Sequence, residues 1–464
     1  MLDKLEQALN KIPLSPKDFL DIRHSYSMGE SFTVRNGRFD SISNQTMGGI
    51  AIRALIDNTW GFTTIVNTDE ESIIKAAKKA IRIAKTGSKY TKQERNISDK
   101  WVYEGKEITK IEIDPREIDK EAKFEKIIET EKAARHFSDT IAESTSYYQE
   151  SHKEEVIVNN KGTKVETENH IIRIGKNVIG REGVKMQNVT DSLGGTGGWE
   201  LIEGWNPEKE GLKAAEEVEK LISARSPPSG KMRVIMDPSL TGVFIHEAFG
   251  HATEADSIIA KRSILEGKIG EKVGVEQINV YDDPTIPTLR GSFKYDSEGT
   301  KAQKRILVKE GVVNEYLHTL ETAETMDLEP NGAGRTMNFN YTPQSRMSNT
   351  YVGPGDMSLE EIAEITKDGV YLCKSYSGYV FTDKGQFSFN CQSGYFVENG
   401  EITDLMGNVG MTGLILEVLN NSYAIGNKWE PAFKGNCGKG GQWVPVSGGG
   451  PNLAVTDVVV GGNS

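Results

Sequence analysis

Apolar residues recur at helical spacing in three segments of the first half of the chain. One stripe lies between residues 73 and 84, a second begins at Phe124, and a third runs from 212 to 222. Apolar side chains three and four positions apart share one face of a helix, so each stripe predicts an amphipathic helix. The residues are Ile73, Ile74, Ala77, Ile81 and Ala84; Phe124, Ile127 and Ile128; Leu212, Ala215, Val218, Leu221 and Ile222.

Between these stripes the pattern is that of β-strands. Apolar runs lie at 48–56, 155–158 and 171–174, and the turn residues at 159–162 separate the second run from the third. Two such runs joined by a turn containing Asn and Gly predict a hairpin. Helices and strands mixed in this order predict an α+β domain.

Past residue 230 the pattern changes to short apolar runs separated by turns rich in glycine. Runs at 278–281, 305–308, 312–317, 369–372, 387–389, 394–397 and 453–455 predict strands, with hairpin turns at 309–311 and 398–401. One helix is predicted after Ser358, which forms a capping box with Glu361. Many short strands with regular turns are typical of a barrel or a sandwich.

The segment 226–230, Ser-Pro-Pro-Ser-Gly, has the composition of a linker. A chain of 464 residues is too long for one ordinary hydrophobic core. We therefore expect an N-terminal α+β domain over 1–225 and a C-terminal β-rich domain over 231–464.

The strongest chemical signal is the segment from His246 to His251, His-Glu-Ala-Phe-Gly-His, in a chain with only seven histidines. Neutral imidazoles are common zinc ligands, and a neighbouring carboxylate such as Glu247 can act as a base on water. Zinc proteases usually space the two histidines four residues apart. In a regular α-helix four residues turn back to within roughly 40° of the starting direction, whereas five overshoot to roughly 140°. The spacing here therefore predicts a π-bulge or a break, which Gly250 would tolerate.

The residues around this motif predict a rigid support. A short buried strand is expected at 232–236, followed by Asp237 as an N-cap and Pro238 at the first helical position. After the motif, Glu254 and Asp256 add two carboxylates. Either they orient the histidine N–H groups, or they are solvated charges at a helix end, and the sequence leaves both readings open.

A catalytic zinc usually has three protein ligands, so a third is needed. Cys373 and Cys391 lie in strand-like segments, where a buried structural thiol is the expected role. Cys437 lies in a glycine-dense stretch, 435–442, that we expect to form a loop with little apolar burial. Lys439 could keep its thiolate charged, and composition alone leaves it open whether this thiol is a ligand or unused.

The remaining histidines carry no ligand spacing along the sequence. We expect them to be ordinary surface or core residues; they are His24, His136, His152, His170 and His318.

Composition excludes some classes of function. The net charge of −12 disfavours general nucleic-acid binding, because phosphates would be repelled. No apolar run is long enough to span a bilayer, the first residues are charged and lack a signal-peptide core, and three cysteines cannot all pair. The sequence therefore predicts a cytoplasmic protein with reduced thiols and no membrane partner.

Beyond these patterns, the chain resembles the TldD/PmbA family of metalloproteases, and the TldD branch in particular. The matching segments run in order over the C-terminal half, and the N-terminal half is similar in outline. They are 246–256, His-Glu-Ala-Phe-Gly-His-Ala-Thr-Glu-Ala-Asp; Arg290-Gly291-Ser292; 296–300; Gly332-Ala333-Gly334-Arg335; 346–351; 438–442; 444–446; and 460–462.

The resemblance implies a specific site and fold. In this family the two histidines of the motif and a late cysteine hold zinc. The corresponding residues here are His246, His251 and Cys437, and Glu247 corresponds to the general base. One Zn²⁺ per chain is expected, on a helix carried by a barrel-like β-domain. The PmbA (TldE) branch lacks the metal motif, so its presence favours the active branch.

The resemblance also implies a substrate and a partner. Family members cleave short or unfolded peptides in a cleft within a dimer, and this chain could pair with itself or with an inactive TldE/PmbA-like paralogue. Two alternatives stay open: a zinc-containing peptide-binding scaffold without turnover, and a zinc hydrolase of a non-peptide amide. The number of protein ligands distinguishes the scaffold from an enzyme. Four protein ligands indicate a structural zinc, whereas three protein ligands and a water indicate a catalytic one.

Overall fold

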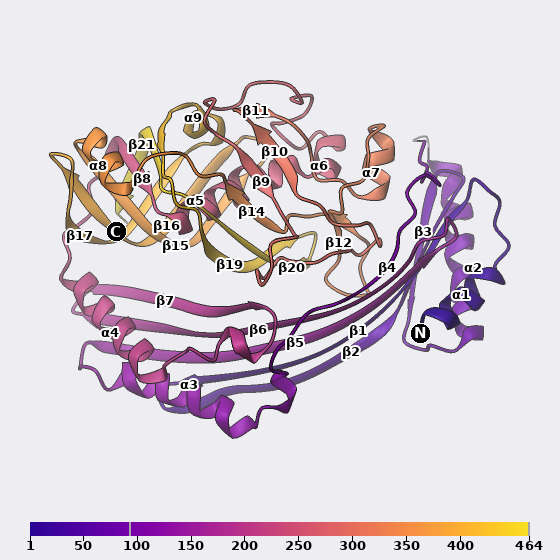
Figure 1. Cartoon of the computed structure of the whole chain (residues 1–464), viewed down its shortest axis with the longest axis horizontal. Coiled ribbons are helices and arrows are strands. Elements are labelled where there is room, and N and C mark those ends of the chain that lie inside the picture. Colours follow the sequence, from indigo (N-terminus) through magenta and orange to yellow (C-terminus); the bar gives the residue numbers. More distant parts are fainter. Residues whose placement is uncertain (92–93, 463–464) are drawn as a thin grey trace.

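A long curved sheet forms the base of the molecule in the computed structural model, which describes residues 1–91 and 94–462 (Figure 1). Over the described residues this sheet has seven strands in the order β3-β2-β1-β5-β6-β4, with β7 also paired to β6. All pairings are antiparallel except that of β4 with β6. The strands are β1 Phe19–Arg35, β2 Arg38–Ile56, β3 Thr59–Ile65, β4 Glu104–Ile108, β5 Ile141–Asn159, β6 Lys164–Glu182 and β7 Lys185–Thr196.

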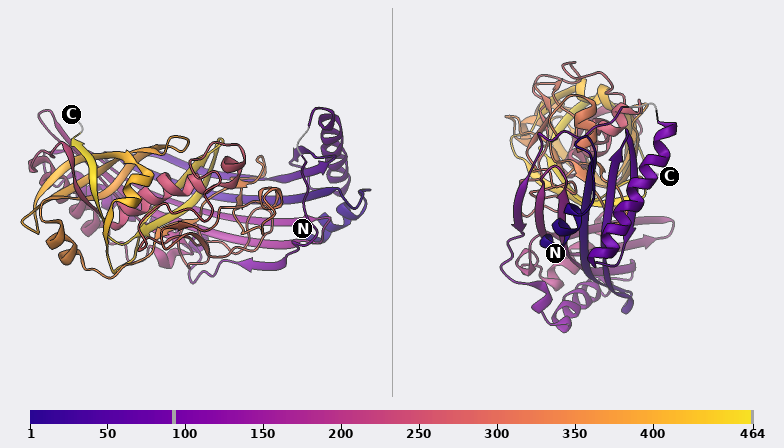
Figure 2. Two further views of the ribbon diagram at one scale, coloured as in Figure 1. Left: turned by 90° about the horizontal axis from the view of Figure 1, so that it is seen from above. Right: turned by 90° about the vertical axis from the view of Figure 1, so that its right-hand side faces the viewer.

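The helices predicted from the apolar stripes are confirmed and cover one face of this sheet. The helices α1 and α2 pack at one end, and α3 and α4 at the other (Figures 1 and 2). The predicted hairpin between β5 and β6 is also present. The elements are α1 Leu2–Asn10, α2 Glu70–Gly87, α3 Lys120–Arg135 and α4 Pro207–Ser223, with short 3₁₀ turns at Ser88–Tyr90, Pro115–Glu117 and Trp199–Leu201.

A closed barrel forms the far part of the C-terminal half. Strands β17-β16-β15-β8-β21 are paired in that order, and β17 also pairs with β21, which closes the ring; β18 extends β21. The expected barrel-like architecture is therefore confirmed. The strands are β8 Gly230–Met236, β15 Gly369–Phe381, β16 Gln386–Glu398, β17 Glu401–Leu414, β18 Ser422–Ile425 and β21 Leu453–Gly462.

A second sheet lies beside the barrel, in the order β11-β10-β9-β14-β20-β19. A two-stranded ribbon of β12 and β13 stands apart from it. The strands are β9 Val280–Asp282, β10 Arg305–Lys309, β11 Val312–Val313, β12 Gly334–Arg335, β13 Gln344–Ser345, β14 Asn349–Val352, β19 Glu430–Lys439 and β20 Gln442–Gly450.

One buried helix, α5 (Pro238–Phe244), lies between the barrel and this second sheet. It approaches β20 so closely that a Cβ on Gly242 would lie 2.5 Å from the backbone nitrogen of Gly449, so only glycine fits there. The predicted capping box of Ser358 and Glu361 is confirmed at the start of α8. The other helices are the π-helix η4 Ile245–Gly250, the 3₁₀ helix η5 His251–Thr253, α6 Ala255–Ile259, α7 Leu320–Thr325, α8 Leu359–Thr366 and α9 Ile415–Asn420.

Buried polar contacts join the long sheet to the C-terminal half. Arg53 of β2 donates to Asp21 of β1 at 2.9 Å and to Glu298 of the C-terminal half at 3.0 Å. Arg23 of β1 donates to the backbone oxygens of Ser297 and Tyr341. The C-terminal half thus rests on the concave side of the sheet, opposite the helices (Figure 1). The division into domains at 225 and 231 stays a prediction.

No helix in the described ranges is long and apolar enough to cross a membrane.

Candidate metal centre

The support predicted around the histidine motif is confirmed. Strand β8 ends at Met236, and Pro238 occupies the first turn of α5. The side chain of Asp237 accepts hydrogen bonds from the backbone N–H of Leu240 at 2.7 Å and of Lys374 at 2.9 Å. Burial raises the pKa of Asp237 to about 6. The cap therefore ties the helix start both to its own first turn and to the barrel strand β15.

The helix changes type at the motif. Residues Ile245–Gly250 form a π-helix, and the backbone N–H of His251 donates to the carbonyl of His246, five residues earlier. This wider turn brings residues five apart to the same side. The ring centroids of His246 and His251 lie 5.5 Å apart. The distortion predicted from the five-residue spacing is therefore present.

Gly250 has a different role from the one its position suggested. Its φ of −56° and ψ of −48° are ordinary helical values, so the π-helix makes no use of glycine's conformational freedom here. A Cβ at this position would lie 2.0 Å from Sδ of Met347, which is fully buried. The residue is small because the helix packs closely against Met347.

The prediction of a loop around Cys437 is wrong. Cys437 lies in β19, and the turn of the β19–β20 hairpin comes only after it, at Gly440 and Gly441, where φ is positive. Its side chain is buried within the hydrophobic core. The glycines on both sides of Cys437 favour a loop when the sequence is taken alone, but hydrogen bonding to β20 holds this segment as a regular strand.

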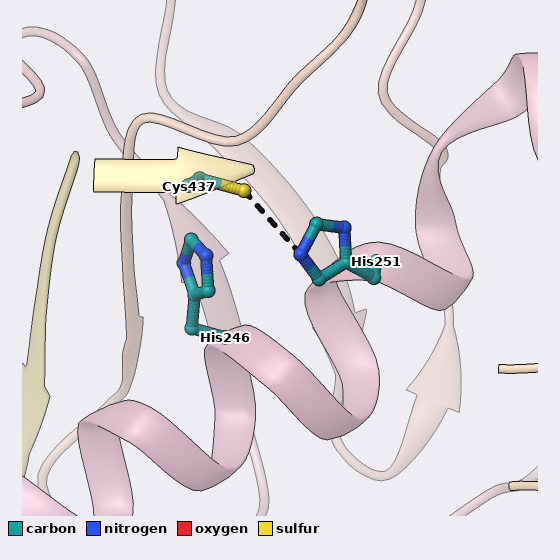
Figure 3. A group of neighbouring side chains, drawn as sticks. All are labelled: His246, His251 and Cys437. Atoms are coloured by element: carbon teal, nitrogen blue, oxygen red, sulfur yellow. Dashed lines mark hydrogen bonds between the residues drawn. The ribbon is translucent and has the colours of Figure 1, made fainter. Parts of the chain in front are cut away.

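The structure brings the three expected ligands together, as Figure 3 shows. Sγ of Cys437 lies 3.3 Å from Nε2 of His251. One donor atom from each of His246, His251 and Cys437 lies within 4.8 Å of the other two. A distorted helix and a strand 186 residues later thus supply one compact set of two nitrogens and a sulfur.

Charge favours the ionised forms of two of these groups. Burial alone would raise the pKa of the Cys437 thiol, but His251 and His246 lower it well below its usual range. Burial alone would lower the pKa of His251, but Glu254 and the Cys437 sulfur raise it well above its usual value. A thiolate is the form of cysteine that binds metals.

Of the two carboxylates after the motif, Glu254 contacts a candidate ligand. Its Oε2 lies 3.1 Å from Nδ1 of His251, and His251 and Lys439 hold its pKa at about 2 although burial opposes this. Asp256 instead pairs with Lys439, at 2.6 Å. Lys439 also lies 3.1 Å from Glu254, so its ammonium group pairs with both carboxylates, and the groups that lower the pKa of the Cys437 thiol most are His251 and His246.

Glu247 lies beside the three candidate ligands without joining them. Its Oε2 is 3.8 Å from Nε2 of His251, and its side chain is 29% exposed. This carboxylate can therefore reach a solvent molecule next to the histidine. That is the position a proton acceptor requires.

The environment of His246 fits a metal ligand. The residue is fully buried, and neither ring nitrogen has a hydrogen-bond partner in the part of the chain described here. Leaving a buried polar atom unpaired costs free energy, so such atoms usually have a partner of another kind. Together with a thiolate and a second imidazole, this set of donors matches the chemistry that zinc prefers.

Two arginines position the cysteine strand, and sequence reasoning gave them no role. Arg346, fully buried, donates to the backbone oxygen of Cys437 at 2.5 Å. Arg290 donates to the carbonyl of Gly435 at 3.1 Å and to the side chain of Asn436 at 3.0 Å. Neither arginine belongs to a periodic pattern of the sequence, so only the tertiary structure reveals these contacts.

The other two cysteines are buried in paired strands, Cys373 in β15 and Cys391 in β16. Burial raises the pKa of both thiols well above the usual value, so both stay protonated. This fits the structural role expected for them.

A cleft of about 1100 Å³ lies beside strand β19, and His246, Glu247, His251 and Cys437 are not among the residues that line it. Residues of both halves line it, including Lys153 and Glu155 of β5 and Arg290 and Trp443 of the C-terminal half. Asn436, the neighbour of Cys437, also contributes to the wall. The cleft therefore lies between the long sheet and the strand that carries the thiol.

Three family models match the chain in succession. They are described as PmbA/TldA metallopeptidase domain 1 (residues 20–84), central domain (113–225) and C-terminal domain (229–462). The chain belongs to the PmbA/TldD family of metallopeptidases.

Curated relatives of this family are similar over nearly their whole length. A protein named Metalloprotease MJ0996 from Methanocaldococcus jannaschii is 37% identical over 456 residues, which is 97% of each chain. A protein named zinc metalloprotease TldD homolog from Saccharolobus solfataricus is 27% identical over 451 residues, 96% of each chain. The resemblance inferred from the motifs is confirmed at the level of the family.

Solved structures share the fold. A Thermotoga maritima protein, described as a candidate modulator of a DNA gyrase, superposes with a TM-score of 0.78 at 22% identity, covering 99% of this chain and 98% of its own. TldE from Thermococcus kodakarensis superposes with a TM-score of 0.74 at 18% identity, covering 99% of each chain. At these identities the likeness concerns the fold alone.

Proposed function

We propose that the protein is a zinc-dependent peptidase of the TldD branch, with one Zn²⁺ per chain held by His246, His251 and Cys437. The observation that carries this proposal is the convergence of these donors, from a π-helix and a distant strand, within 4.8 Å of one another. The name of the Saccharolobus solfataricus relative, a zinc metalloprotease, agrees with it.

Zinc held by two nitrogens and a thiolate supplies Lewis-acid chemistry, which acidifies water and polarises a carbonyl group. Glu247 is placed to take a proton from the attacking water and to return it to the leaving amine. Glu254 keeps the His251 ring oriented through Nδ1, so that Nε2 faces Cys437. Among the described residues the group holds three donors, which favours a catalytic zinc over a structural one.

The substrate in this proposal is a short or unfolded peptide that lies in the cleft. The edge strand β4 supports strand addition, because it pairs only with β6 among the described strands and its residues Glu107 and Ile108 line the cleft. Backbone pairing of this kind is indifferent to most side chains. The indole of Trp443, 59% exposed at the same cleft, offers an apolar contact for a substrate side chain.

The proposal includes a dimer, formed with a second copy or with an inactive TldE/PmbA-like chain. The shared fold with TldE supports a partner of similar shape. It also includes a cytoplasmic location, which the three unpaired cysteines favour.

Metal analysis and peptide cleavage test the proposal together. The purified protein should contain about one zinc per chain and cleave members of a mixed, unstructured peptide library, as followed by mass spectrometry. A chelator should abolish cleavage, and added zinc should restore it. A zinc-loaded protein that leaves the whole library intact would contradict the proposed activity.

A further inference from the structure

Two histidines far from the metal centre lie side by side in the long sheet. His152 of β5 and His170 of β6 stand directly opposite each other in the antiparallel pairing. Both are buried, and Nδ1 of His152 lies 2.8 Å from Nε2 of His170. The two histidines are 18 residues apart in the sequence, which is not a spacing typical of metal ligands. The β5–β6 hairpin nevertheless places them side by side.

A carboxylate completes a triangle with these two nitrogens. Glu168 is two residues before His170, so both side chains leave β6 on the same face. Its Oε1 lies 3.3 Å from Nε2 of His170 and 3.8 Å from Nδ1 of His152. In a tetrahedral site with donors about 2.0–2.1 Å from zinc, neighbouring donors are about 3.3 Å apart. The three distances lie around that value.

We propose that His152, His170 and Glu168 form a second metal site, which takes a divalent ion of the zinc type in addition to the one at His246, His251 and Cys437. Two imidazoles and one carboxylate are a common ligand set for zinc and for divalent ions of similar preference. The two ring nitrogens are also at hydrogen-bonding distance, and a bound ion would replace that hydrogen bond.

A further carboxylate prepares one of the ligands. Oε1 of Glu154 lies 3.0 Å from Nε2 of His152, the ring nitrogen that faces away from the triangle. A carboxylate in this position accepts the Nε2 proton and leaves Nδ1 with a free lone pair. Asp114 and Arg116 are the other charged groups that act on His170, and they pair with each other at 2.6 Å. The charge of Arg116 also interacts with Glu168 and Glu154. Two carboxylates therefore face two imidazoles, which suits a dication.

The second site is separate from the first but reachable from solvent. The neighbours of its histidines, Ser151, Lys153 and Asn169, line the large cleft, whereas the two buried histidines do not. Glu168 also lines the cleft and its side chain is 31% exposed. Ions can therefore enter from the cleft past Glu168, and a bound ion would tie β5 to β6 beside the wall of the cleft.

Zinc titration of the full-length protein tests the inference, with metal content measured after removal of unbound ions. The parent should start with about one zinc per chain and take up a second on titration, whereas His152→Gln should stay at one. Glu168→Gln should weaken the second ion by about tenfold or more, since even groups behind a ligand contribute that much. His24→Gln, a change on the neighbouring strand β1 outside both clusters, should still bind two.

Cobalt distinguishes the two sites by their ligands. In the parent the first Co²⁺ should give a thiolate charge-transfer band, whereas the second should give only weaker bands, because its site contains no sulfur. If His152→Gln fails to fold, Glu168→Gln still tests the second site, because the Glu168 side chain is partly exposed and its replacement should leave the fold intact. The inference is overturned if the parent binds a single ion, if Glu168→Gln binds the second as tightly as the parent, or if His24→Gln loses it.

Discussion

His251 is the residue on which the contacts of the metal centre converge. Its Nε2 faces Cys437 at 3.3 Å, and its Nδ1 faces Glu254 at 3.1 Å. A carboxylate at Nδ1 fixes the ring orientation of this histidine and leaves Nε2 as the nitrogen that faces a metal. His246 differs, because the described residues provide its ring nitrogens with no hydrogen-bond partner.

Replacement of either Cys437 or His251 should remove zinc from the candidate metal centre. Cys437→Ser and His251→Ala should lower bound zinc at this site strongly, because two protein donors hold the ion far more weakly than three. Cys373→Ala changes a buried thiol in β15, outside the cluster, and should leave bound zinc unchanged. Metal content of the purified variants measures this. Full retention of zinc by Cys437→Ser would remove the cysteine from the site.

Glu254→Gln should weaken zinc binding without removing a ligand. Glutamine keeps the size of the side chain but loses the charge that faces His251, and such changes typically cost about 10–100-fold in metal affinity. Competition with a chelator measures the affinity. Asp256→Asn is the matched control, since Asp256 contacts Lys439 and should affect affinity little. Equal losses in the two variants would show that Glu254 has no special role.

At the scale of elements, the motif depends on a helix that is not a regular α-helix. The sequence predicts this, because five-residue spacing cannot place two rings on one side of an α-helix. The strand, the N-cap at Asp237 and the amphipathic helices also follow from local patterns, which short-range interactions determine. Strand β19 does not, because its glycines favour a loop and only pairing with β20 makes it a strand.

Gly250→Ala tests the packing of the π-helix. The added methyl would meet the buried Met347, so we expect a loss of about 1–3 kcal/mol in the free energy of unfolding and less bound zinc, as His251 shifts. Gly204→Ala adds the same atom where no other atom lies within 4 Å and should change neither quantity. Urea unfolding and metal analysis measure both. If Gly250→Ala behaves like Gly204→Ala, the close contact with Met347 has no consequence.

At the scale of the molecule, a curved sheet supports the C-terminal half (Figure 1). This sheet forms one wall of a cleft whose other wall includes the cysteine strand. This arrangement was outside the reach of sequence reasoning. The first half of β2 is largely exposed, so no alternation of apolar residues marks it as a strand. Likewise Arg290 and Arg346 act through contacts with backbone oxygens 145 and 91 residues away.

Arg53 joins the sheet to the C-terminal half, and its removal should destabilise the whole chain. Arg53→Met keeps the aliphatic stem but leaves Asp21 and Glu298 as buried, unpaired carboxylates, which should cost about 3–5 kcal/mol. Lys17→Met breaks an exposed pair with Asp57 and should cost about 0–1 kcal/mol. Denaturant unfolding measures the free energy of unfolding of both variants. Equal losses would show that the buried ion pairs of Arg53 contribute no more than an exposed pair.

The measurement that tests the account most directly is peptide cleavage by Glu247→Gln with its zinc content checked. Glutamine keeps the size of Glu247 but cannot accept the proton of water, and Glu247 is no ligand, so bound zinc and the melting temperature should match the parent. General-base catalysis typically contributes about 10²–10⁴-fold, so the rate should fall by at least that range. Near-parental cleavage by the zinc-loaded variant would contradict the proposed mechanism.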